Sequence, residues 1–271
     1  MKRIALSLLC LMLPILTVTA QTKIDFTDIE IVNLGDGQRY IKEVKSSTPL
    51  NGKKRIINGV TEQYIDVDLK DGLLNGKWEY YDKSKLKELL NFKNGYMDGK
   101  QQAFFVATGK PEYEGNMKMG KKHGEWIYFS SNGNKREMEV YADNSMTKRV
   151  TYYTSGQVEQ ERNFKQGKED GVSKAFTNEG KMKYERTFVN GKQIGKERSL
   201  ISSNSGDFFI TCNYNDKGNK DGDYSEEWAD SKKPKAKGKY LNGQKDGKWT
   251  EWTSRGDVKK EETYKNGAVV N

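Results

Sequence analysis

The chain has 271 residues and a formal net charge of +9, from 47 Lys and Arg against 38 Asp and Glu, with a single His. Hydrophobic residues make up 34% and charged residues 31%, a balance that argues against the large apolar core of an α/β enzyme. Disordered chains share this balance but are poor in rings, whereas this chain has 10 Phe, 15 Tyr and 5 Trp. We therefore expect a thin β structure that depends on its aromatic residues.

The first twenty residues have the pattern of a secretory signal peptide. Lys2 and Arg3 precede an apolar stretch over residues 4–18, and small residues before position 21 permit cleavage after Ala20. The apolar stretch has about 15 residues, fewer than the ~20 that a membrane-spanning helix needs, which argues against an anchor. Cys10 follows Leu9 rather than a small residue, which argues against a lipoprotein signal. We predict an exported protein, periplasmic or extracellular, that begins at Gln21.

The predicted mature chain has one cysteine, Cys212. An exported protein with a single cysteine has no intramolecular disulfide, so packing and hydrogen bonds must stabilise it. No second apolar segment approaches spanning length, and we expect the mature chain to be soluble.

Pairs of glycines four residues apart recur along the chain with a period of about 24 residues. One interval is twice as long, and there residues 143–165 form a degenerate unit without the pair. The predicted structural turn glycines are Gly72, Gly76, Gly95, Gly99, Gly120, Gly124, Gly167, Gly171, Gly191, Gly195, Gly218, Gly222, Gly243 and Gly247. A period kept through this many units indicates a repeat protein.

Each unit predicts a β-hairpin. In the unit that starts at Gly76, Trp78 and Tyr80 alternate with charged neighbours, which indicates a strand. Residues 82–84 predict a turn, and a second strand ends near Phe92. Asn94-Gly95 then tolerates the positive φ that reverses the chain.

The unit Gly-x-x-x-Gly-x-Trp-x-x-Tyr, followed by a glycine turn and an acidic residue about three before Tyr or Phe, resembles the MORN repeat. More narrowly, it resembles bacterial MORN-variant repeats of antitoxin-like proteins. The positions that carry the resemblance include 98–100, 123–128 and 246–249, with Glu114, Glu161, Glu185 and Glu261 in the acidic column. The unit at residues 191–215 departs from the pattern with Ser199 and Leu200 in place of rings, and the unit at 218–241 is stretched.

The resemblance covers residues 69–267 and implies an all-β fold. We expect an elongated single-layer antiparallel meander or solenoid of about eight β-hairpin repeats over residues 69–271. Residues 21–68 match faintly, and we expect them to form an irregular N-terminal cap or degenerate repeat that covers the first open edge.

Rings recur at fixed positions of the unit and predict stripes along the sheet. Because side chains alternate between faces, we expect one stripe to be covered by the curl of the sheet and the other to stay partly open. Aromatic residues dominate interface energetics, so they are the candidates for a partner-binding surface. The predicted contact residues are Trp78, Trp126, Tyr128, Trp249 and Trp252.

The sequence offers no recognisable catalytic set. His123 is the only imidazole, and the repeat places it nearly four units from Cys212, too far for a nucleophile–base pair. One His and one Cys cannot supply a zinc site. We therefore expect no catalytic residues, no metal, no cofactor and no enzymatic activity.

We predict that the protein is a scaffold that binds a protein partner, and the family resemblance implies an antitoxin- or immunity-like role. The alternative is an envelope module that binds carbohydrate or lipid, because Trp- and Tyr-rich repeats also resemble cell-wall-binding repeats. An envelope glycan or an anionic lipid surface stays open as a partner. The positive charge is spread through every unit, so we expect no nucleic acid partner.

Overall fold

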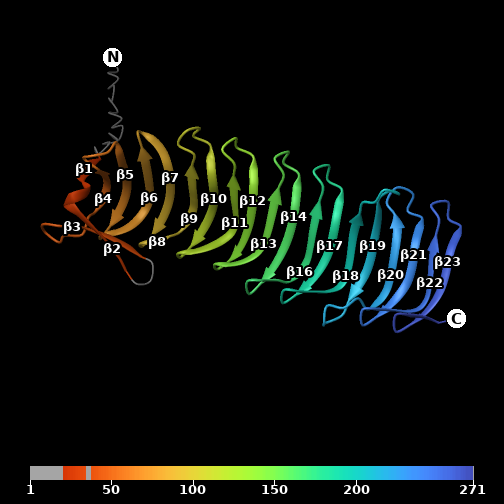
Figure 1. The fold of residues 1–271 in the computed structure, drawn as a ribbon. Coiled ribbons are helices and arrows are strands. Elements are labelled where there is room, and N and C mark those ends of the chain that lie inside the picture. The colour runs from red at the N-terminus through yellow and green to blue at the C-terminus, as the bar shows by residue number, and fades with distance from the viewer. Residues whose placement is uncertain (1–20, 35–37, 271) are drawn as a thin grey trace, which may run out of the picture.

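The computed structural model describes residues 21–34 and 38–270 as one open antiparallel sheet of hairpins. Figure 1 shows bowed strands side by side in chain order, from the N-terminal end to the C-terminal end, as an elongated trough. The described residues contain no α-helix. The predicted fold class, an all-β meander of hairpin repeats, is confirmed, whereas the predicted signal peptide lies outside the described residues.

The N-terminal elements are β1 (Thr22–Asp25), the 3-10 helix η1 (Phe26–Asp28), β2 (Ile29–Asn33), β3 (Arg39–Glu43), β4 (Gly52–Ile57) and β5 (Gln63–Lys70). The next strands are β6 (Leu73–Asp82), β7 (Lys85–Lys93), β8 (Tyr96–Met97), β9 (Gly99–Phe104), β10 (Pro111–Lys118), β11 (Lys121–Phe129), β12 (Lys135–Ala142), β13 (Ser145–Tyr152) and β14 (Val158–Lys165). The last are β15 (Lys168–Glu169), β16 (Gly171–Phe176), β17 (Met182–Val189), β18 (Lys192–Ile201), β19 (Phe208–Tyr214), β20 (Gly222–Trp228), β21 (Pro234–Leu241), β22 (Gln244–Trp252), β23 (Val258–Lys265) and β24 (Ala268–Val270).

The N-terminal end differs from the rest because it has a second layer. β1 pairs with β4 in parallel, and β2 and β3 form a hairpin that touches the start of β6. Ile29 and Ile41 from this hairpin pack with Ile56, Val67 and Leu74 of the sheet in one apolar cluster. This packing gives the N-terminal end an ordinary hydrophobic core.

The two glycines of each pair have different places in the hairpins. All fourteen predicted turn glycines have positive φ, and Asn94-Gly95, with φ of 49° and 83°, forms a tight turn of the expected kind. The second glycine lies inside or at the start of the following strand, as Gly124 does in β11. The pair therefore marks a turn together with the first residues of the next strand.

The two faces of the sheet differ in burial. We call the inner face the side that carries Ala103, Trp126, Ser173, Glu197 and Trp249, all of which are buried. The opposite side, here the outer face, carries cross-strand ion pairs such as Lys148–Glu161 at 3.6 Å and Lys174–Glu185 at 3.1 Å. The inner face thus buries most of the large side chains of the repeats, whereas the outer face carries charged pairs together with a few buried residues such as Val150.

Two tryptophans of the inner face lie directly on a glycine of the preceding strand. A Cβ atom on Gly115 would be 2.2 Å from the Trp126 ring, and one on Gly238 would be 2.2 Å from the Trp249 ring. Each glycine sits at an irregularity in strand register. Each indole donates to a carbonyl just past it, Trp126 to Asn116 at 3.0 Å and Trp249 to Lys239 at 3.1 Å. Glycine therefore lets the ring lie flat on the neighbouring backbone.

Trp78 has the same place in its unit but a different neighbour. It pairs with Val67 of β5, a strand without glycine. The ring consequently stays half-buried and packs against the N-terminal apolar cluster.

The stripe of rings is not continuous along the inner face. In the described residues, ring pairs of the inner face occur in β6–β7, in β10–β11 and in β19–β23, with none between β12 and β18. There the inner face is bridged by charged side chains, with Arg149–Glu139 at 2.6 Å and Arg186–Glu197 at 3.0 Å. The predicted aromatic stripe is thus corrected to clusters of rings joined by ionic hydrogen bonds.

Among the helices in the described part of the chain, none has the length and apolar character to span a bilayer.

The glycine–tryptophan contact predicts that the effect of Gly115→Ala on the free energy of unfolding depends on whether Trp126 is present. Gly115→Ala should lower the free energy of unfolding by about 1–3 kcal/mol, because the new methyl group overlaps the indole. In a Trp126→Ala background the same change should be neutral or stabilising by about 0.5–1 kcal/mol, because alanine suits a strand better than glycine. Urea unfolding of the four proteins measures both values. An equal loss in both backgrounds would show that the contact is not the reason for this glycine.

Candidate functional site

The five predicted contact residues lie in three separate places. Trp126 is buried at 6% exposure, and the Tyr128 hydroxyl donates to Glu139 at 3.0 Å on the same inner face. Lys122 lies over the Trp126 ring at 4.4 Å. The polar and aromatic groups of this cluster already interact with one another, so we assign the cluster to the packing of the sheet.

Trp78 lines a groove at the N-terminal end. This N-terminal groove, about 430 Å³, has mostly apolar walls that include Ile31, Ile65, Tyr80 and the half-exposed Phe26. It lies where the β2–β3 hairpin meets the inner face of the sheet.

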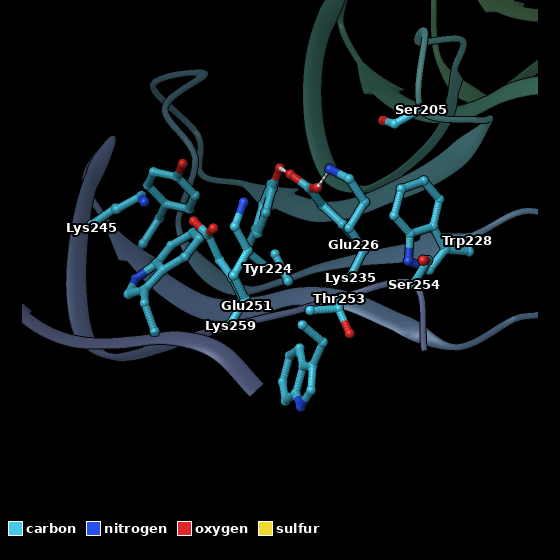
Figure 2. A pocket seen from close by; sticks show the side chains of 14 residues that line it. Ser205, Tyr224, Glu226, Trp228, Lys235, Lys245, Glu251, Thr253, Ser254 and Lys259 are labelled. Carbon is cyan, nitrogen blue, oxygen red and sulfur yellow. Dashed lines mark hydrogen bonds and ion pairs between the residues drawn. The ribbon is translucent and has the colours of Figure 1, made fainter. Parts of the chain in front are cut away.

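Trp249 and Trp252 both line a second groove, which we call the C-terminal groove, and Trp252 also borders the outer face beside Thr250 and Glu261. Its volume is about 630 Å³, and its lining comes from β20 to β23 and the loop before β19 (Figure 2). The residues that line it are Ser205, Tyr224, Glu226, Trp228, Lys235, Ala236, Tyr240, Lys245, Trp249, Glu251, Trp252, Thr253, Ser254 and Lys259. Trp249 is buried at 5% exposure, so it forms the floor, whereas Trp252 is half-buried.

The C-terminal groove depends on the units that depart from the repeat pattern. The loop over residues 202–207 is fixed to the end of β20, where the Ala229 N–H donates to the Asp207 carbonyl at 2.9 Å. Phe208 and Trp228 are cross-strand partners, and their rings meet edge to face at 6.1 Å. The irregular loop thus brings Ser205 to a wall that Trp228 completes.

Glu226 is held firmly at the centre of the groove. Its carboxylate accepts from the Tyr224 hydroxyl at 2.7 Å and from the Lys235 ammonium, as Figure 2 shows. The Lys235 ammonium also lies 3.6 Å from the centre of the Phe208 ring. Burial, followed by the hydrogen bond and the charge of Glu226, raises the pKa of Tyr224 well above its usual value.

Other charges in and beside the groove have no opposite charge in contact. The Lys245 ammonium lies over the Trp249 and Tyr264 rings at 4.1 and 4.8 Å. Among residues 21–34 and 38–270, no carboxylate lies within 4 Å of the Lys245 or Lys259 ammonium, nor does any ammonium contact Glu251. Lys245 is therefore a cation that rings hold in place without neutralising it.

Trp228 has an unsatisfied donor. Its side chain is buried at 9% exposure, and its Nε1 is a buried polar atom without a hydrogen-bond partner. A buried donor without an acceptor costs about 1–3 kcal/mol, which makes its presence in a groove wall informative.

The two residues considered for nucleophilic chemistry lie far apart in the sheet. His123 is in β11, where its ring contacts Asp143 at 3.8 Å, and Cys212 is in β19, with β12 to β18 between them. Burial, the largest influence, raises the pKa of the Cys212 thiol. Within the described ranges, no three His, Cys, Asp or Glu side chains are grouped to hold a metal ion.

Comparison with protein families identifies the repeats. A family model described as the MORN repeat variant matches residues 74–94, 122–143, 148–166, 169–190 and 245–266. These five segments are therefore similar to MORN-type repeats. The matched segments correspond to hairpins such as β6–β7, β11–β12 and β22–β23, and residues 148–166 fall in the unit that lacks a glycine pair. No curated protein matches the chain.

The longest stretch between matched segments, residues 191–244, supplies half of the C-terminal groove, including Tyr224, Trp228 and Lys235. Sequence reasoning missed Trp228, because it lies outside the repeating columns of rings. It also missed Gly115 and Gly238, although a glycine eleven residues before a tryptophan is a signal that the sequence does contain. The site thus lies where the repeat is least regular.

The raised pKa of Tyr224 predicts alkaline sensitivity. Below the usual tyrosine pKa of 10.0 the phenol is protonated in both the folded and the unfolded chain. As the pH rises further, the unfolded chain loses this proton first, so the free energy of unfolding should fall from about pH 10 upward. Tyr224→Phe should make this fall shallower, as measured by urea unfolding between about pH 8 and 12. Equal slopes in both proteins would mean that Tyr224 ionises as easily in the folded chain.

Proposed function

We propose that this protein is an exported, non-enzymatic scaffold that binds a protein partner through the C-terminal groove. MORN repeats are in general modules for protein or membrane interaction, which supports a binding role. The observation that carries the proposal is the groove itself, in which the half-buried rings of Tyr240 and Trp252, charges without an opposite charge in contact and a buried free donor occur together.

Protein recognition fits the chemistry of this groove. Interface centres are rich in tryptophan and tyrosine with a few well-placed polar groups, and the groove has this composition. Its volume of about 630 Å³ suits an extended segment of a partner rather than a whole domain. An antitoxin- or immunity-like role is one form of this function, in which the partner is a toxin met outside the cytoplasm.

A second candidate is binding of an envelope carbohydrate. The observation that favours it is the presence of three tryptophans beside two carboxylates in one groove. Capture from an envelope extract, followed by treatment of the captured material, separates the candidates. Loss of binding after protease treatment supports a protein partner, and loss only after glycan digestion or lipid extraction supports the alternative.

If the partner binds in the C-terminal groove, a tryptophan substitution there should reduce recovery of the partner, and one in the N-terminal groove should not. After crosslinking in the native host, Trp252→Ala should reduce the recovered partner about tenfold, because it removes a half-buried ring from the lining of the C-terminal groove. Trp78→Ala, which alters the N-terminal groove, is the matched control and should leave recovery unchanged. The reverse pattern would move the proposed contact to the N-terminal groove, and circular dichroism checks that both variants fold.

Export predicts the start of the mature chain. Intact-mass analysis of the protein from the native host should give the mass of residues 21–271, with Gln21 or its cyclised form at the N-terminus. An Ala20→Arg variant should retain the first twenty residues, because the cleavage site needs a small residue there. Recovery of the native protein with Met1 in place would contradict export by this route.

A further inference from the structure

We propose that the C-terminal groove recognises an acidic peptide segment, one carboxylate of which accepts the hydrogen bond that Trp228 Nε1 leaves unmade. This inference rests on the proposed function and names the chemistry of the partner. It begins with the missing acceptor, because Nε1 is buried, is a donor only, and has no partner in the described residues.

The surroundings of Trp228 favour an incoming oxygen. Ser205, Thr253 and Ser254 line the same groove, and the turn at residues 253–256 is largely exposed. Because Nε1 is buried in the free protein, a ligand oxygen reaches it only after neighbouring side chains change rotamer, which exposed side chains do rapidly. Hydroxyl and indole donors together suit an acceptor with several lone pairs, which describes a carboxylate.

The charge of the groove selects an acid over a neutral acceptor. Glu226 and Lys235 form an ion pair, so their charges cancel. The remaining charged side chains of the lining are two cations, Lys245 and Lys259, and one anion, Glu251. Lys220 adds a further ammonium beside the groove, 5.2 Å from the centre of the Tyr224 ring, also without a carboxylate within 4 Å in the described chain. The groove therefore has an excess of positive charge, part of which rings hold in position before a ligand arrives.

The shape of the groove selects an extended ligand. Its lining comes from four successive strands, β20 to β23, so the groove runs across the strands of the sheet. Trp252 and the floor ring Trp249 offer apolar contact along this path, while the cations lie beside it. An extended peptide with acidic side chains matches both features.

The test uses two defined peptides of equal length, the acidic Ac-(Ser-Glu)4-NH2 and the neutral Ac-(Ser-Gln)4-NH2, with the full mature chain. Fluorescence anisotropy of labelled peptides should show binding of the acidic peptide at least tenfold tighter than of the neutral one. The preference should shrink as salt rises, because screening weakens charge attraction. Tetragalacturonate, an acidic glycan with the same four carboxylates as the peptide, tests the competing ligand class.

Variants connect the binding to the named groups. Trp228→Phe keeps the ring but removes the donor, and it should weaken binding of the acidic peptide about tenfold. The same change should leave the thermal midpoint equal or higher, because an unsatisfied buried donor disappears; a purely structural tryptophan would lower it. Lys245→Gln with Lys259→Gln should also cost about tenfold in affinity, whereas Lys196→Gln on the outer face should cost nothing.

Three outcomes would overturn the inference: no preference for the acidic peptide, no effect of Trp228→Phe on affinity, or tetragalacturonate binding as tightly as the peptide. The proposed function has its own separate test. If Trp252→Ala abolishes capture of the host partner while the acidic peptide fails to bind, the protein-binding function stands and the acidic recognition is wrong.

Discussion

A single-layer sheet must cover one of its faces with side chains from its own strands, because no second layer packs against it. The contact between Trp126 and Gly115 solves this locally, since the absence of a Cβ atom lets the indole lie on the adjacent backbone and bond to it. Trp249 and Gly238 repeat the solution near the other end. Burial of a large ring within one layer thus depends on a glycine in the strand before it.

In units without an aromatic residue at the position of Trp126, charged and polar side chains cover the inner face. Glu197 occupies the position of Trp126 in its own unit, and its carboxylate accepts from Arg186 at 3.0 Å and from Gln193 at 2.9 Å. Burial opposes ionisation of Glu197, but the bonds from Ser199 and its other donors outweigh this, so its pKa is lowered. Directional bonds of this kind fix the register between strands that have little apolar surface to align.

The fold could be predicted from the sequence because the signals that specify each hairpin lie within that hairpin. Turns such as Asn94-Gly95 and the alternation around Trp78 act within one hairpin, and their repetition extends the sheet without any long-range pairing. The burial of Trp126 could not be predicted in this way, because it depends on the register that places Gly115 beneath it. The C-terminal groove was also out of reach, since it requires the loop at 202–207 to meet Trp228.

The same contrast between regular and irregular units bears on why the proposed binding site lies in the irregular units. Regular hairpins bury their rings and can bond the indole donors, as Trp126 does, although Ser173 Oγ in a matched unit is also buried without a partner. The unit that carries Trp228 leaves a donor unsatisfied, which lowers the stability of the free protein by an amount that a ligand can recover on binding. Neighbouring repeats tolerate this loss because stability in such arrays is shared among many similar interfaces. In this sheet, regular units provide the rigidity that allows an irregular unit to keep a buried donor unsatisfied.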